Sequence, residues 1–238
     1  MKRLLYIFLC LSLLTACRQD ELPEVQGEAV LELDLQRMGR PTMGVTRAID
    51  DDLALDIFKD GALYNNMHFA PGTAPRKIVL EPGTFTIRAY TDNQTTWQEG
   101  KGEACYLKDT TVVMEKDMIK RLQVRVPMIN YAVSLQLPEL WDTFFPIYTF
   151  RLKSGSRTVV IKQGERAYFD VADRKFSYEL SATNTDGRTS SHSAIDFTDI
   201  EAGKLFTLYY HYDSDANTGG IDIVITDDMT TDDNHINL

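Results

Sequence analysis

Apolar and polar residues alternate at every second position in short runs along most of this chain. In the run AVLELDL at residues 29–35, the alanine and three leucines fall on one face and two acidic residues on the other. This period of two is typical of a strand with one buried face, whereas an amphipathic helix repeats about every 3.6 residues. Similar runs lie at residues 53–58, 76–80, 84–90, 110–115, 121–128, 131–137, 147–153, 157–162, 175–182, 205–212 and 221–226. We therefore predict an all-β fold.

The predicted strands are brief, and glycine, proline, asparagine and aspartate separate them. Short strands spaced about 8–12 residues apart, with turn residues between them, are the pattern of antiparallel β-sandwiches. The segment LEPGTFTIRAY at residues 80–90 also aligns with IEAGKLFTLYY at residues 200–210. This weak internal repeat favours two similar units.

The boundary between the two units is placed at Pro127. This proline follows a predicted strand and cannot donate a hydrogen bond to a central ladder. We therefore expect tandem antiparallel β-sandwich domains at residues 27–126 and 127–228, followed by an acidic tail at residues 229–238.

The first 16 residues have the form of a signal peptide. Lys2 and Arg3 precede an apolar run at residues 4–16, which is too short to cross a bilayer because a spanning helix needs about 20 residues. The stretch LTAC at residues 14–17 resembles the lipobox of bacterial lipoproteins, which implies that Cys17 becomes the first mature residue and carries the lipid. A triacylated cysteine would anchor the chain durably, whereas one acyl chain binds a membrane only marginally.

A polar, acidic tether, RQDELPEVQ, follows Cys17 and completes residues 17–26. It resembles the surface-export signal of Bacteroidetes lipoproteins, which implies a position on the outer face of the outer membrane. The alternative is an ordinary solvated linker that faces the periplasm.

The charge of the chain argues against one class of partner. Removing residues 1–16 takes two of the 25 basic side chains, so the mature chain has 23 against 35 acidic ones and a formal charge of −12. Nucleic-acid binding depends on basic patches, so we expect no nucleic-acid partner. With one cysteine in the signal peptide and Cys17 lipidated, Cys105 has no partner for an intrachain disulfide.

The sequence carries no linear catalytic or cofactor motif. Its four histidines lie on separate segments, and no phosphate-binding glycine loop or paired-cysteine motif occurs. Asp213, Asp215 and Asn217 resemble the start of a calcium loop, but the required glycine and final glutamate are absent, so a hairpin is predicted there. We expect no enzyme, no cofactor and no metal, although a catalytic carboxylate pair needs no linear signature.

Two aromatic segments are candidates for contacts. Trp97 lies in the polar loop DNQTTWQEGKGEACY, where an exposed indole would stack on a sugar or insert into a partner. The alternative is packing of Trp97 within the fold. For Trp141 and its aromatic neighbours at residues 144–148, core or inter-domain packing is predicted.

Several motifs together resemble a family of Bacteroidetes surface lipoproteins of unknown function. These are the lipobox at residues 14–17, LELDL at 31–35, TRA at 46–48, IVLEPGTFTIRAY at 78–90, ACYLKDTTVVME at 104–115 and VRVPMINYAVSLQL at 124–137. The family is similar in turn to fimbrillins and fimbrial anchor proteins, which implies transthyretin-like (Ig-like) sandwich domains. It implies no catalytic residues.

The same resemblance implies a processing site. In fimbrillins, proteolysis after an arginine in an early loop removes the first strand and opens a groove for a strand of a neighbouring subunit. Arg47 holds a comparable place, and a cut there would make Ala48 the new amino terminus. A chain tethered through Cys17 would lose its anchor by that cut. The resemblance therefore favours an anchor or accessory subunit over a shaft subunit.

Two functions are expected from these features. The first is a non-enzymatic outer-membrane lipoprotein on the cell surface, acting in cell adhesion or as a fimbria-associated anchor or accessory subunit. Its partners would be the outer membrane, through the lipid, and other fimbrial or surface proteins. The alternative is a surface glycan-binding lipoprotein of a polysaccharide-uptake system, with Trp97 at the glycan.

Overall fold

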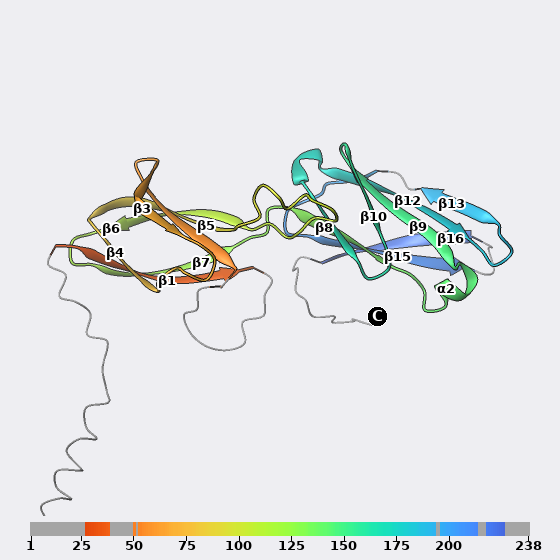
Figure 1. Cartoon of the computed structure of the whole chain (residues 1–238), viewed down its shortest axis with the longest axis horizontal. Helices are drawn as coiled ribbons and strands as arrows, with labels where there is room; N and C mark the ends of the chain where they lie inside the picture. The colour runs from red at the N-terminus through yellow and green to blue at the C-terminus, as the bar shows by residue number, and fades with distance from the viewer. Residues whose placement is uncertain (1–26, 39–49, 51, 194–195, 214–217, 227–238) are drawn as a thin grey trace, which may run out of the picture.

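The computed structural model describes residues 27–38, 50, 52–193, 196–213 and 218–226 (Figure 1). The lipidation site Cys17, the processing site Arg47-Ala48 and the tail at residues 229–238 lie outside these residues. Within them, no helix has the length and apolar character that crossing a membrane requires.

The described residues form four β-sheets, which confirms the all-β prediction. The first sheet has the order β4-β1-β7, with β1 (Ala29–Arg37), β4 (Lys77–Leu80) and β7 (Ile119–Val126). The second has the order β3-β2-β5-β6, with β2 (Leu53–Lys59), β3 (Ala62–Phe69), β5 (Gly83–Thr91) and β6 (Leu107–Met114).

The third sheet has the order β10-β9-β12-β13, with β9 (Ile147–Ser154), β10 (Arg157–Ile161), β12 (Lys175–Thr183) and β13 (Thr189–Ser193). The short β14 (Phe197–Thr198) also pairs with β12. The fourth has the order β11-β8-β15-β16, with β8 (Tyr131–Gln136), β11 (Arg166–Phe169), β15 (Leu205–Asp213) and β16 (Thr218–Thr226). The helical elements described are α2 (Trp141–Phe144) and one 3₁₀ turn, η1 (Val171–Asp173).

Two ladders depart from the predicted antiparallel pairing. β1 pairs with β7 in parallel, and β8 pairs with β15 in parallel. The other ladders of the described residues are antiparallel. Alternation shows that a segment is a strand but carries no information on the direction of a partner far along the chain. Two parallel strands also need a long connection between them. Here the connection from β1 to β7, and that from β8 to β15, contains most of the other strands of the same half.

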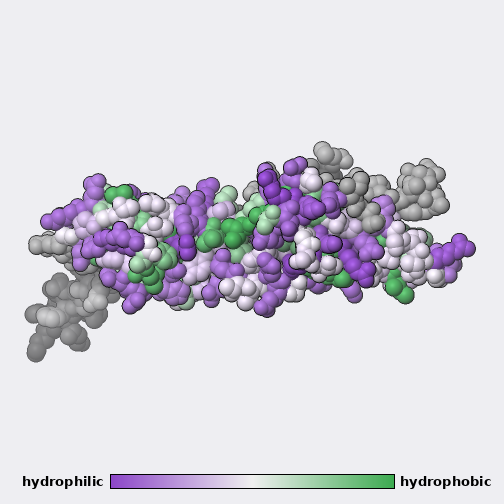
Figure 2. Space-filling view, turned by 90° about the horizontal axis from the view of Figure 1, so that it is seen from above, coloured by the Kyte–Doolittle hydropathy of each residue, from purple (hydrophilic) through white to green (hydrophobic). Residues whose placement is uncertain are grey.

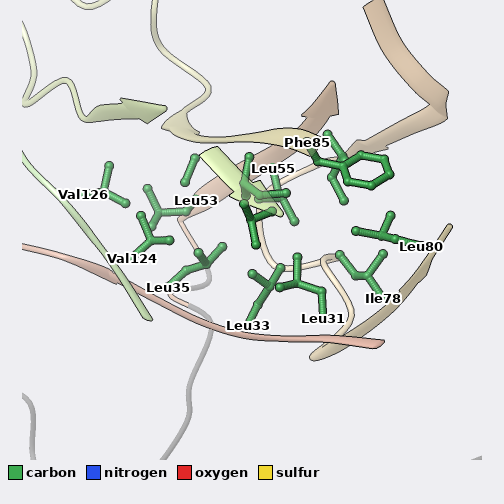
Figure 3. Packing of buried hydrophobic residues seen from close by; sticks show 14 of the residues in the cluster. Leu31, Leu33, Leu35, Leu53, Leu55, Ile78, Leu80, Phe85, Val124 and Val126 are labelled. Atoms are coloured by element: carbon green, nitrogen blue, oxygen red, sulfur yellow. The ribbon is translucent and has the colours of Figure 1, made fainter. Parts of the chain in front are cut away.

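Each pair of sheets encloses its own hydrophobic cluster, and the two pairs lie end to end along the long axis (Figure 1). The first cluster contains the inward leucines of β1 with residues of β2, β4, β5 and β7 (Figure 3). The second contains the aromatic residues Tyr131, Phe150, Phe169 and Phe176. The division into independent domains at Pro127 stays a prediction, which separate expression of the two halves would test.

The repeat that suggested two units does not align equivalent strands. Residues 80–90 contain β5, an inner strand with two antiparallel neighbours. Residues 200–210 contain the start of β15, which has β8 as a parallel neighbour. By sheet order β1 corresponds to β8 and β7 to β15. The two halves share an arrangement, but the matching motif does not mark equivalent strands in it.

Candidate functional site

β1 is the middle strand of the first sheet and the one that a fimbrillin-like cut would remove. It pairs with β4 on one side and with β7 on the other. Among the described strands, β4 and β7 each pair with β1 alone. On its outer face Glu32 lies between Lys77 and Arg121, with N–O separations of 3.9 Å and 2.8 Å. On its inner face Leu31 and Leu35 are fully buried. β1 therefore completes both the sheet and the core of this half.

The chain on either side of residues 39–49 is held together at the end of β1. Arg37 Nε donates to Asp50 Oδ2 at 2.9 Å, and the same guanidinium donates to Asp52. The Asp50 N–H donates to the Leu35 carbonyl at 2.9 Å. Burial works to raise the pKa of the Asp50 carboxyl, but the hydrogen bond and charge of Arg37 outweigh it, so this pKa lies below its usual value.

This contact, which we call the Arg37–Asp50 clamp, bears on the predicted processing site. Arg47 and Ala48 lie in the segment that the clamp brackets and are outside the described residues. A cut after Arg47 would leave β1 attached by two ladders, its buried leucines and the clamp. A cut in this segment would therefore leave in place the contacts that hold β1 in the sheet.

The loop between β5 and β6, at residues 92–106, packs inward. Trp97 is only 8% exposed, which overturns the expectation of an exposed indole that contacts a glycan or a partner. The backbone N–H of Trp97 donates to the Asn93 carbonyl at 2.9 Å, and the Trp97 backbone carbonyl accepts from the backbone N–H of Glu103 at 2.8 Å. The polar residues of the loop bond to one another and to the backbone, so a polar composition does not place this tryptophan in solvent.

The same loop binds the second half of the molecule, and we call it the bridging loop. Arg157 of β10 donates to the Gly100 carbonyl at 2.9 Å and also to the Tyr168 carbonyl. The Tyr168 N–H donates to the Lys101 carbonyl at 2.8 Å. Burial lowers the pKa of the Arg157 guanidinium below its usual value, and the group lies over the Phe169 ring at 5.1 Å from its centroid.

Gly102 allows the bridging loop to approach the second half this closely. Its φ is +81°, and a Cβ at this position would lie 2.9 Å from the Trp97 carbonyl oxygen and 3.0 Å from that of Tyr168. Both the backbone conformation and the space therefore require glycine.

Asn130 fixes the chain where it passes from one half to the other. Its side chain accepts from the Cys105 N–H at 3.1 Å and donates to the Glu103 carbonyl at 2.7 Å. Its carbonyl accepts from Gly203 at 2.9 Å. Cys105 is fully buried, and burial raises the pKa of its thiol, which disfavours the reactive thiolate and agrees with a packing role.

The aromatic segment around α2 divides between core and surface. Trp141 is buried and stacks on Phe145 at 4.5 Å between ring centroids, as the packing prediction expects. Leu140, Phe144 and Ile147 are each more than half exposed. Figure 1 places α2 at the end of the molecule away from the first half, so this segment does not pack between the halves. On the face in Figure 2, hydrophobic residues form small separate groups in a mostly hydrophilic surface.

Polar groups on the outer face of the second sheet form a row across its strands. His68 Nδ1 lies 2.6 Å from Asp56 Oδ1, and the Tyr90 hydroxyl donates to the other carboxylate oxygen at 3.1 Å. Arg88 donates to Asp109 through two nitrogens, each at 2.8 Å. The row lies in register on adjacent strands and ties them together, a contact that strand-by-strand sequence reasoning does not find.

The region that resembles the start of a calcium loop forms a hairpin, as predicted. Asp213, the last residue of β15, pairs with Thr218, the first residue of β16, while Asp215 and Asn217 lie outside the described residues. Across the part of the chain that the structure describes, no group of three or more His, Cys, Asp or Glu residues is placed to hold a metal ion.

The fold resembles solved structures from Bacteroides and Porphyromonas. A candidate cell adhesion protein from Bacteroides uniformis matches with a TM-score of 0.50 and 11% identity, over 84% of this chain and 98% of that one. The tip fimbrial protein Mfa3 from Porphyromonas gingivalis, with a C-terminal truncation, matches with 0.48 and 9%, over 84% and 99%. Candidate polysaccharide binding proteins from Bacteroides thetaiotaomicron match with 0.47 and 10%, over 84% and 96%. At these identities the likeness concerns the fold alone.

At the level of sequence, no curated protein matches the chain. One family profile does, over residues 47–238, and it is described as a domain of unknown function, DUF4493. The matched segment contains every described strand except β1. The expected membership in a family of unknown function is thus confirmed. This chain belongs to the DUF4493 family.

Proposed function

We propose that this protein is a cell-surface lipoprotein that acts in adhesion as an anchor or accessory subunit of a fimbria, and that it keeps its own first strand. One observation carries the proposal. β1 occupies the centre of its sheet, with buried leucines beneath it and the Arg37–Asp50 clamp at its end.

The position of β1 supports the anchor role over that of a polymerising subunit. A subunit that accepts a neighbour's strand must offer an open sheet edge or an empty place in the sheet, because the incoming strand binds through unpaired backbone groups. Here β4 and β7, the two strands that such an incoming strand would have to join, are already paired with β1. A chain held by a lipid at Cys17 and closed by β1 would remain attached and would not take up a donor strand at this site.

The adhesive part of the proposal is supported by the fold. The candidate cell adhesion protein from Bacteroides uniformis shares the arrangement over most of both chains. The glycan-binding alternative depended on an exposed Trp97, and the burial of this side chain removes that support.

The first test is mass spectrometry of the mature amino terminus from native membranes, with surface protease accessibility on intact cells. A triacylated Cys17 on an accessible protein is the expected result. A lipid-free chain that begins at Ala48 would contradict the proposal and indicate a processed, polymerising subunit.

A second test asks whether β1 stays in place when the loop is cut. The folded chain is treated with a trypsin-like protease, and an Arg47→Gln variant serves as the uncut control at that bond. We expect the fragment that contains β1 to co-purify with the remainder under native conditions and to separate only in denaturant. Release of the fragment without denaturant would show that cleavage alone opens the sheet.

A further inference from the structure

The two halves of the molecule are joined in the chain by a short connecting segment, residues 127–130, between β7 and β8. Two domains linked in this way usually bend and twist relative to each other, unless a further interface opposes the motion. Whether this protein bends at residues 127–130 therefore depends on what else joins its halves.

The connecting segment is itself held against the base of the bridging loop. Met128 forms an antiparallel bridge with Tyr106, and both side chains belong to the first hydrophobic cluster. The Ile129 N–H donates to the Cys105 carbonyl at 2.8 Å, and the Asn130 side chain accepts from the Cys105 N–H. The segment thus continues the backbone pairing of the first half and is not a free linker.

The tip of the bridging loop makes a second connection, to β10 and β11 of the second half. The Gly100 carbonyl accepts from Arg157, and the Lys101 carbonyl accepts from the Tyr168 N–H. The Lys101 ammonium also lies 2.5 Å from a carboxylate oxygen of Glu165. This second connection uses residues that are remote in sequence from the connecting segment.

The Tyr168 side chain crosses from the second half to the first. Its neighbours Ala167 and Phe169 are buried in the second cluster, so the alternation of the strand turns Tyr168 to the outer face of β11. There it packs against the first hydrophobic cluster. Gly102 lies close beside it, since a Cβ at Gly102 would be 3.1 Å from the Tyr168 Cβ. The junction therefore combines apolar packing, hydrogen bonds and close backbone contact.

The arrangement of these contacts restricts rotation as well as separation. Two bodies joined at one point rotate about it, whereas a second joint away from the first leaves rotation only about the line between the joints. Here the connecting segment is the first joint and the tip of the bridging loop is the second, while the packing of Tyr168 opposes the remaining rotation. We propose that the bridging loop fixes the orientation of the two halves, so that the protein acts as one rigid body and not as two domains on a hinge.

A fixed junction goes beyond the proposed anchor role and does not depend on it. The start of β1 and the helix α2 lie at opposite ends of the molecule (Figure 1). With the junction fixed, the orientation of the first half sets the direction in which the α2 end points. A load on the α2 end is also shared between the connecting segment and the bridging loop.

Double electron–electron resonance between two spin labels measures whether the halves keep one orientation. In the full chain, p-acetylphenylalanine replaces Val160 of β10 together with either Val113 of β6 or Ile119 of β7, and oxime-linked nitroxides are attached. The three side chains are about half exposed, and the chain's cysteines take no part in the labelling. Since β6 and β7 belong to different sheets of the first half, the two pairs report on different directions of motion. We expect one narrow distance distribution for each pair.

Gly102→Ala tests the role of the bridging loop, and Gly100→Ala is its matched control. Both glycines have positive φ, but a Cβ at Gly100 would meet no atom within 4 Å. We expect Gly102→Ala to broaden both distance distributions, because the loop can no longer approach β11, and Gly100→Ala to leave them as in the wild type. Arg157→Ala should also broaden them, and it adds no atom to the junction. Circular dichroism confirms that each variant is folded.

Three results would overturn the inference. Broad distributions in the wild-type chain would show that the halves move with all these contacts present. Narrow distributions in both folded Gly102→Ala and folded Arg157→Ala would show that the connecting segment alone sets the orientation. Equal broadening by Gly100→Ala would assign the effect to strain within the loop. None of these results bears on lipidation of Cys17 or on adhesion, which the amino-terminal mass spectrometry and surface accessibility test separately.

Discussion

The guanidinium of Arg157 lies 2.9 Å from the carbonyl oxygen of Gly100, although the two residues belong to different halves of the molecule. The same side chain also bonds to Tyr168, so one cation satisfies two backbone carbonyls at the junction. The relation between the halves therefore depends on a side chain and a loop as well as on the connecting chain.

Replacing Arg157 with alanine should weaken this junction. Two carbonyls lose a charged donor, and we expect the free energy of unfolding to fall by about 1–3 kcal/mol. Urea denaturation followed by fluorescence measures the change. Arg151→Ala is the control, because Arg151 makes an exposed pair with Glu179 at 3.2 Å and should cost about 1 kcal/mol or less. Equal losses for the two variants would argue against a special role for Arg157.

Truncating the inner face of β1 should destabilise the first half. Leu35 is fully buried in its cluster, so Leu35→Ala should lower the free energy of unfolding by about 2–5 kcal/mol. The adjacent Gln36 lies on the other face, and Gln36→Ala should change it by about 0.5 kcal/mol or less. If both variants unfold at the wild-type urea concentration, β1 does not contribute to this core.

Alkaline pH should unfold the protein through its buried tyrosines. Burial raises the pKa of Tyr131 to about 12, and its hydroxyl donates to Ser154 at 3.0 Å. Because the pKa in the unfolded chain is about 10, the unfolded state loses its proton first. The stability from this group is complete below pH 10 and declines as pH rises toward 12, by about 3 kcal/mol.

A Tyr131→Phe variant isolates that contribution. Its free energy of unfolding should fall less steeply between pH 10 and 12 than that of the wild type, in urea titrations at fixed pH. The remaining decline comes partly from Tyr90 and Tyr178, whose pKa values burial also raises to about 12. Identical slopes for the two proteins would refute the assignment to Tyr131.

Trp97→Ala should behave as a core substitution. The buried indole predicts a loss of about 3–5 kcal/mol in the free energy of unfolding, whereas Gln98→Ala, on an exposed neighbour, should have little effect. Retention on immobilised polysaccharide should be the same for wild type and variant under conditions where both are folded. A selective loss of retention in folded Trp97→Ala would restore the glycan-binding alternative.

The sequence predicts those strands that carry an apolar residue at every second position, and it fails where this alternation is interrupted or absent. β1 and β12 alternate clearly because each faces a core. β3 and β13 lie at sheet edges, and the segments ALYNNMHF and TSSHS carry no regular apolar face. Their pairing comes from a neighbouring strand and cannot be read from their own residues.

The contacts of the bridging loop were beyond sequence reasoning for a different reason. Trp97 and Arg157 are far apart in the chain, and neither has a local pattern that identifies its environment. Gly102 gave the available signal, since a glycine inside a polar loop is consistent with close backbone approach. The signal does not say which segment approaches.

The parallel ladder between β1 and β7 also sets an order of events during synthesis. Its partners Glu32 and Arg121 are 89 residues apart, so β1 emerges long before the strand it pairs with. Closing so long a loop is slow compared with forming a hairpin. β1 therefore lacks one of its two neighbouring strands until the last strand of the half is made. A chaperone that holds this segment would act on the earliest part of the fold to appear and one of the latest to be completed.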